Sequence, residues 1–127
     1  MKNLFLLLFY LAVTLIYAQK DKQYPIIEFE QTTINYGKIT SDSSGRRTFK
    51  FKNIGNIPLI IKKVKGSCGC VVLDFPKEPI MPGESDEIKI VYNVLKKGRI
   101  SRTVTVTANT EKPITILKIK GKVLKDK

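Results

Sequence analysis

The sequence predicts an all-β fold, an immunoglobulin-like antiparallel β-sandwich of about seven strands. Apolar and polar residues alternate with a period of two in short runs, most clearly in Arg47–Asn53 (RTFKFKN) and in residues 103–107 (TVTVT), as half-buried strands require. Turn-forming residues separate these runs about every 8–12 positions, and no amphipathic helix pattern follows residue 24. This spacing is typical of a sandwich, and an up-and-down barrel is the alternative.

Residues 1–18 have the layout of a cleavable signal peptide. Lys2 supplies a positive charge, residues 4–16 are an apolar run, and Ala18 precedes the polar Gln19, which predicts cleavage after Ala18. A spanning helix needs about 20 apolar residues, so a membrane anchor is the weaker interpretation. No cysteine near the site would accept a lipid. We therefore expect an exported, soluble protein, periplasmic or extracellular, that does not span the membrane after cleavage.

After a short leader at residues 19–24, the domain is expected over residues 25–125, and one parity in each run points inward. Gly37 marks a bend or bulge. Apolar residues at 114, 116, 117 and 119 change parity, which predicts a bulge near Leu117. Strands are expected over residues 24–30, 32–39, 47–53, 59–64, 71–75, 86–93, 103–107 and 114–123. The residues expected to face the core include Ile27, Phe29, Ile34, Tyr36, Phe49, Phe51, Leu59, Ile61, Ile88, Ile90, Tyr92, Val104 and Val106.

Loops are expected where glycine, proline and small polar residues gather. Residues 40–45 (TSDSSG) and 53–56 (NIGN) are turn-rich, and Pro58 suits a strand start because its missing donor is harmless there. Residues 76–85 hold three prolines and the Pro82–Gly83 turn signal. Residues 96–99 and 109–113 make the last two connections.

The chain carries 23 Lys and Arg against 11 Asp and Glu, a net charge of +12. Most lysines alternate with apolar residues, which is typical of solvated strand faces. We therefore expect no nucleic-acid partner, but weak contact with an acidic glycan or lipid surface. Histidine is absent, which removes Ser-His and Cys-His dyads and imidazole metal ligands. We expect no enzymatic activity and no cofactor.

The only two cysteines, Cys68 and Cys70, flank Gly69. In an exported protein they tend to oxidise, and three interpretations stay open. They could form a strained, reducible disulfide suited to thiol–disulfide exchange, with glycine allowing the bend. They could bind a soft metal such as Cu(I) with help from Met81 or a second copy. They could be structural, with or without a bridge, which is the interpretation we favour. Lysines 62, 63 and 65 would favour a thiolate nearby.

Several of these residues together carry a resemblance to a known family. The run Tyr36–Ile39, the segment from Phe49 to Ile61 and the Cys-Gly-Cys sequence resemble the bacterial exported domain-of-unknown-function family numbered 1573. The resemblance covers most of the chain after the leader and departs from the family at Val71, where threonine is frequent, and at Tyr36, where phenylalanine is usual. The matching motif positions are Asn53, Gly55, Pro58, Leu59, Gly69, Pro82 and Gly83.

This family is similar to the immunoglobulin-like modules of the Hydin and major-sperm-protein type, which are interaction domains. The resemblance implies a sandwich fold and export, and it implies no catalytic residue. We therefore expect a non-catalytic module that contacts an envelope or extracellular protein. Redox or copper handling through Cys68 and Cys70 is the alternative.

Overall fold

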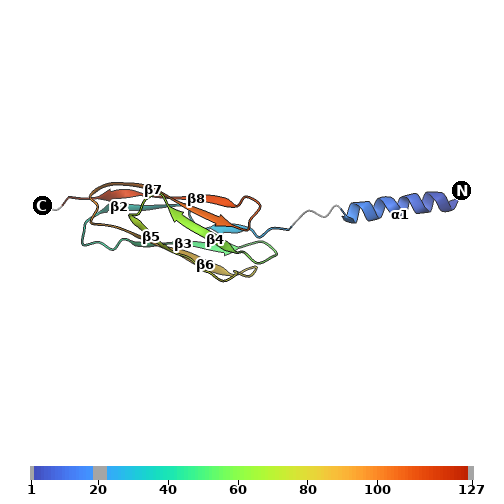
Figure 1. Ribbon diagram of the computed structural model, residues 1–127, viewed down its shortest axis with the longest axis horizontal. Helices are drawn as coiled ribbons and strands as arrows, with labels where there is room; N and C mark the ends of the chain where they lie inside the picture. The colour runs from blue at the N-terminus through green and yellow to red at the C-terminus, as the bar shows by residue number, and fades with distance from the viewer. Residues whose placement is uncertain (1, 19–22, 126–127) are drawn as a thin grey trace.

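The computed structural model describes residues 2–18 and 23–125 and shows one helix followed by eight strands (Figure 1). The elements are α1 (Lys2–Ala18), β1 (Ile27–Phe29), β2 (Thr33–Ile39), β3 (Arg46–Asn53), β4 (Ile61–Gly66), β5 (Val71–Asp74), β6 (Ser85–Tyr92), β7 (Gly98–Ala108) and β8 (Ile114–Val123). In α1 the apolar side chains from Leu4 to Leu11 are exposed. Within the described ranges, no helix has both the length and the apolarity to cross a membrane. The predicted cleavage falls between Ala18 and Gln19, and Gln19 lies outside the described residues.

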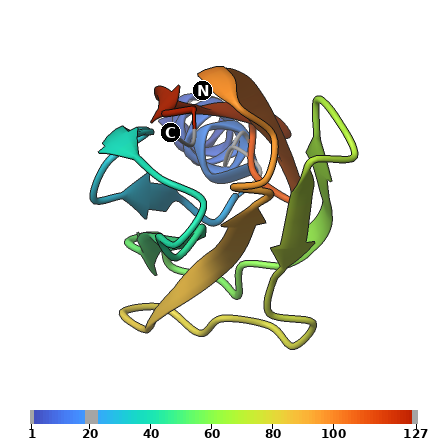
Figure 2. The same ribbon diagram turned by 90° about the vertical axis from the view of Figure 1, so that its left-hand side faces the viewer.

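The strands form two four-stranded sheets, confirming the predicted sandwich class (Figures 1 and 2). One sheet has the order β1-β3-β6-β5 and the other the order β2-β8-β7-β4. All neighbours are antiparallel except β2 and β8, which are parallel. The prediction of purely antiparallel sheets is therefore wrong for this pair, because side-chain periodicity records which face is buried and not the direction of the neighbouring strand.

Most of the predicted inward positions lie in the core between the two sheets, and Ile27 and Phe29 are partly buried against it. Phe49, Ile88, Ile90 and Val104 are completely buried. Leu59 and Ile61 are buried as expected, at 0% and 4% exposure. Burial of each such side chain contributes roughly 1.5–3 kcal/mol, so these alternating positions are the main source of the fold's stability.

Register irregularities lie in β2 and β4 and not at Leu117. The register between β2 and β8 shifts between Asn35 and Lys38, and Gly37 has a φ of 68°, so the predicted irregularity at Gly37 is confirmed. In contrast, the pairing of β7 with β8 continues without a shift through Val104 and Leu117. The change of parity near Leu117 has another cause: Ile114 and Ile116 are apolar but point outward, at 58% and 56% exposure.

Some strand boundaries also differ from the expected ones. β4 begins at Ile61, and Leu59 instead forms an isolated bridge with Ile80. β1 is only three residues long, whereas β7 begins at Gly98 inside the predicted turn. The turn itself lies at Asn93–Lys96, where the Asn93 carbonyl accepts from the Lys96 amide at 3.1 Å.

Candidate functional site

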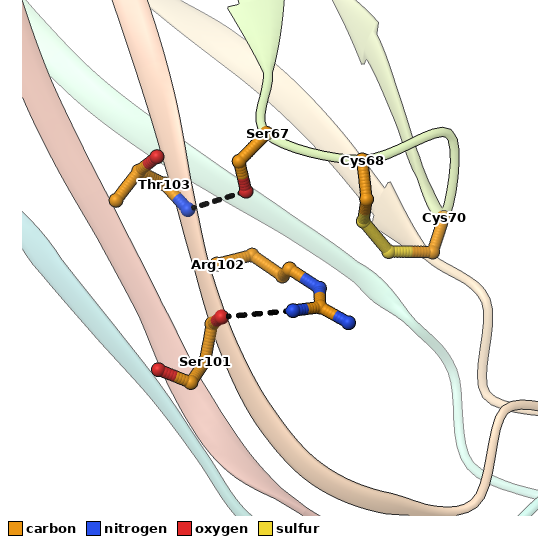
Figure 3. Close-up of a disulfide and its surroundings, with 6 residues drawn as sticks. All are labelled: Ser67, Cys68, Cys70, Ser101, Arg102 and Thr103. Atoms are coloured by element: carbon orange, nitrogen blue, oxygen red, sulfur yellow. Dashed lines mark hydrogen bonds between the residues drawn. A yellow bond between two sulfur atoms is a disulfide. The ribbon is translucent and has the colours of Figure 1, made fainter.

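The Ser67–Cys70 turn connects the edge strand of one sheet, β4, with the edge strand of the other, β5. Cys68 and Cys70 form a disulfide whose Cα atoms are 5.3 Å apart (Figure 3). The two cysteines are half-buried against the core, and Gly69 between them is exposed. The bridge therefore lies at a corner where the chain passes from sheet to sheet.

Neighbouring strands hold both ends of this turn. The Thr103 amide donates to Ser67 Oγ at 3.1 Å, and the Ser67 amide donates to the Thr103 carbonyl at 2.9 Å. At the other end, the Asn93 amide donates to the Cys70 carbonyl at 2.9 Å. Gly69 has no positive φ, and a Cβ at this position would meet nothing within 4 Å. The bridge therefore does not depend on the conformational freedom of glycine, contrary to the sequence expectation.

Arg102 is the cation beside this turn, and sequence reasoning missed it. It has the same parity as the buried Ile100 and Val104, and its side chain extends from β7 toward the disulfide (Figure 3). Its Nη1 donates to the Ser101 carbonyl at 3.3 Å, and its Nε is buried without a hydrogen-bond partner. The sequence contains a signal that could have revealed Arg102, because this residue occupies an inward position in a strand of alternating residues.

The lysines that were expected to act on the cysteines have other positions. Lys63 and Lys65 pair with Thr107 and Thr105 and share the outward parity of β4, and Lys62 is exposed at a register irregularity. Met81 lies before β6, whereas Cys70 bonds to Asn93 just after it. With about 3.4 Å per residue, the eight residues of β6 separate Met81 from the cysteines by more than about 25 Å. Met81 therefore cannot complete a metal site with them in one chain.

The remaining motif residues meet at the opposite end of the sandwich. Asn53 is the one buried polar side chain of the described residues. Its Nδ2 donates to the Ile57 carbonyl at 2.8 Å and the Ile80 carbonyl at 3.0 Å, and its Oδ1 accepts from the Gly55 amide at 3.0 Å. Its backbone carbonyl accepts from Gly83 at 2.8 Å. Asn53 therefore connects two loops by hydrogen bonds.

The other motif positions lie in or beside the two loops that Asn53 connects. A Cβ on Gly55 would lie 2.6 Å from the Ile26 amide nitrogen, so glycine lets the two backbones touch. The Pro58 carbonyl accepts from Asn109 at 3.2 Å, Leu59 pairs with Ile80, and Gly83 adopts a φ of 84° in the turn after Pro82. These residues act in folding, and the structure assigns none of them to a ligand.

Tyr36 forms a second buried polar contact. Its hydroxyl donates to the Gly45 carbonyl at 2.8 Å, and the Arg47 guanidinium lies 4.4 Å from the centre of its ring. Burial raises the pKa of Tyr36 to about 12, although the Arg47 charge acts in the opposite direction. This tyrosine pins the loop before β3 and remains protonated at neutral pH.

The acidic residues before and in β6 do not form a cation site. Glu84 Oε2 accepts from the Met81 amide at 3.1 Å, and Asp86 accepts from the Glu87 amide at 2.8 Å. Throughout residues 2–18 and 23–125, no group of three or more His, Cys, Asp or Glu side chains could hold a metal ion.

The two packed four-stranded sheets define an immunoglobulin-like β-sandwich domain. The model of the family described as "Protein of unknown function (DUF1573)" matches residues 27–123, so the chain belongs to that family. No curated protein matches the sequence.

Three solved structures support the fold assignment. A protein of unknown function from Porphyromonas gingivalis W83 is 20% identical with a TM-score of 0.70, and the match covers 84% of this chain and half of that one. A PapD-like domain of human CEP192 is 7% identical with a TM-score of 0.68, covering 86% and 92%. The CupB2 chaperone of Pseudomonas aeruginosa is 11% identical with a TM-score of 0.55, covering 76% and 55%. At these identities the likeness shows the fold alone.

Proposed function

We propose that this protein is an exported, non-catalytic immunoglobulin-like module that binds another protein of the cell envelope or extracellular space. The observation that carries the proposal is the composition of its interior. Among the described residues, the buried side chains between the sheets are mainly hydrophobic, and the polar groups of Asn53 and Tyr36 bond to backbone atoms. Activity is therefore assigned to the surface and the turns, where binding is the simplest role.

The signal-peptide pattern supports export. If residues 1–18 are removed on export, the protein isolated from the envelope or medium of its own cells begins at Gln19. N-terminal sequencing of fractionated protein tests this expectation. An intact chain that begins at Met1 and is confined to the cytoplasm would refute the export part of the proposal.

The binding part is tested by reversible cross-linking of the tagged chain in intact cells, followed by mass spectrometry of captured proteins. We expect a partner that the wild type captures and that Gly55→Leu does not, because a side chain at Gly55 collides with the backbone of Pro25 and Ile26 and disrupts the fold. A protein captured better by Gly55→Leu would be recognising the unfolded chain, and this result would count against a specific binding module.

Thiol–disulfide exchange by Cys68 and Cys70 is the second candidate. Two observations favour it: the pair is only half-buried, and Arg102 extends toward it (Figure 3). A cation near a reduced cysteine favours the reactive thiolate. The disulfide itself fits a structural role equally well. A reduction potential below about −300 mV would mark a structural bridge, whereas a value near that of thiol oxidoreductases would favour exchange.

Copper handling is the remaining alternative. It requires the reduced form, because thiolates are the ligands of Cu(I). Since Met81 is far from the turn, two copies of the chain would have to supply four thiolates. Copper bound by the reduced protein in a ratio of one ion per two chains, and lost in Cys68→Ser, would support this function.

A further inference from the structure

The two sheets differ sharply in charge. The strands of the β2-β8-β7-β4 sheet contain nine Lys and Arg and no Asp or Glu. The strands of the β1-β3-β6-β5 sheet contain five Lys and Arg and four Asp and Glu. Most of the chain's excess positive charge therefore belongs to one sheet, which the even spread of lysines along the sequence conceals.

Strand register places seven of these cations on the outer face of their sheet. Since inward positions are occupied by buried residues such as Val104, Leu117 and Ile119, the alternate positions face solvent. We call this surface the basic face. Its cations are Lys38 on β2, Lys63 and Lys65 on β4, Arg99 on β7, and Lys118, Lys120 and Lys122 on β8.

The cations are close enough to act together. Lys122 pairs with Lys38 on one side and with Arg99 on the other, giving three positive residues in one row across the sheet. Along β8, the alternate lysines repeat about every 6.8 Å, less than the screening length of about 8 Å at physiological ionic strength. Like charges directly opposite each other destabilise a sheet, and an anion lying across them would remove that cost.

The opposite sheet shows how the same strand pattern is neutralised elsewhere. There Lys50 pairs with Glu87, Lys52 with Glu28 and Lys89 with Asp74. Lysines on that sheet face carboxylates of neighbouring strands, so the face has little net field. The contrast shows that solvated strands in this protein do not require a single sign of charge.

The basic face also contains a hollow. This hollow of about 690 Å³ lies over β7 and β8, and its outward-facing lining includes Arg99, Lys118 and Lys120 together with the hydroxyls of Ser101 and Thr103. Outward hydroxyls continue along β7 through Thr105 and Thr107, between the lysines of β8 and those of β4. A strip of hydrogen-bonding hydroxyls flanked by cations fits a linear chain that carries both hydroxyl and acidic groups.

We propose that the basic face binds a linear acidic polysaccharide, laid along β7 with its carboxylate or sulfate groups against the lysines of β8. Outward strand positions of this sheet carry no aromatic residue, so the stacking platform that single-stranded nucleic acids use is missing. A lipid surface is flat and would not enter the hollow. This ligand goes beyond the protein partner proposed above and does not depend on it.

The test compares two variants with equal changes of charge. Lys118→Gln/Lys120→Gln/Lys122→Gln removes three cations from the basic face, and Lys50→Gln/Lys52→Gln/Lys89→Gln removes three from the opposite sheet. All six side chains are exposed, and urea unfolding of both variants confirms that they fold. Binding of the full chain to immobilised dextran sulfate, polygalacturonate and neutral dextran is measured in low and physiological salt.

The proposal predicts binding to both acidic polymers and not to neutral dextran, with affinity that falls as salt rises. The β8 triple variant should bind at least about tenfold more weakly, at roughly 1 kcal/mol per lysine near an anionic surface. The opposite-sheet variant should lose less than about threefold. Equal losses in the two variants, or no binding by the wild type, would overturn the proposal. So would binding that requires the β8 lysines but occurs only on phosphatidylglycerol vesicles or on duplex DNA.

Discussion

Removing the side chain of Asn53 should be among the most destabilising single changes outside the apolar core. The Asn53→Ala substitution deletes three hydrogen bonds, to Ile57, Ile80 and Gly55, at a completely buried position. Each such bond contributes about 0.5–1.5 kcal/mol net, and a buried group left unpaired costs about 1–3 kcal/mol. The Ile80 carbonyl keeps its bond from Leu59, so we expect a total loss of about 3 kcal/mol.

Urea unfolding followed by circular dichroism measures this loss. With an m-value of roughly 1–1.5 kcal/mol/M for a domain of this size, the midpoint should fall by about 2 M while m stays constant. Asn56→Ala is the matched control, because Asn56 is an exposed asparagine in the same turn. It should change stability by less than about 0.5 kcal/mol. A loss at Asn53 below about 1 kcal/mol, or equal to that of Asn56, would refute the assignment of the motif to folding.

Three further predictions concern other features of the fold. Gly55→Ala should lower the free energy of unfolding by more than about 2 kcal/mol, because its Cβ would lie 2.6 Å from backbone. Gly69→Ala should be nearly neutral, because nothing lies within 4 Å of a Cβ there. Thermal melts of both variants check this prediction, and equal losses of stability would contradict it. The stability advantage of wild type over Tyr36→Phe should be constant below pH 10 and shrink as pH rises toward 12, because the pKa of Tyr36 is raised to about 12 in the folded state. Urea unfolding measures this advantage, and a value unchanged at pH 12 would contradict the prediction. Replacing Cys68 and Cys70 together by serine should cost only about 1.5 kcal/mol, the loop entropy of so short a ring, and a loss above about 4 kcal/mol would mean that the bridge organises the fold.

The alternation of residues predicted which side chains enter the core, and the structure confirms this for residues such as Phe49, Phe51 and Val106. Periodicity could do so because burial of alternate residues is a local property of a strand. Periodicity could not reveal that β2 runs parallel to β8, because these two strands come from distant parts of the sequence. The predicted bulge at Leu117 failed for a related reason, because Ile114 and Ile116 are apolar yet exposed.

The surface features could be recognised only from the order of the strands in each sheet. Arg102 was missed because the predicted strand began at residue 103, whereas β7 begins at Gly98 and gives Arg102 an inward position. The basic face was missed because lysines are spread along the whole sequence. Only the sheet order shows that the acidic residues of the strands all belong to the other sheet.

We propose that the protein works by non-covalent binding through its folded surface and not through its cysteines. The most direct test is to repeat the cross-linking capture in intact cells with the Cys68→Ser/Cys70→Ser variant and to compare it with the wild type on non-reducing gels. We expect both proteins to capture the same partner in similar amounts and no wild-type complex to depend on a disulfide. A partner held only by the wild type, and released by reductant, would rule out purely non-covalent binding and favour thiol–disulfide exchange.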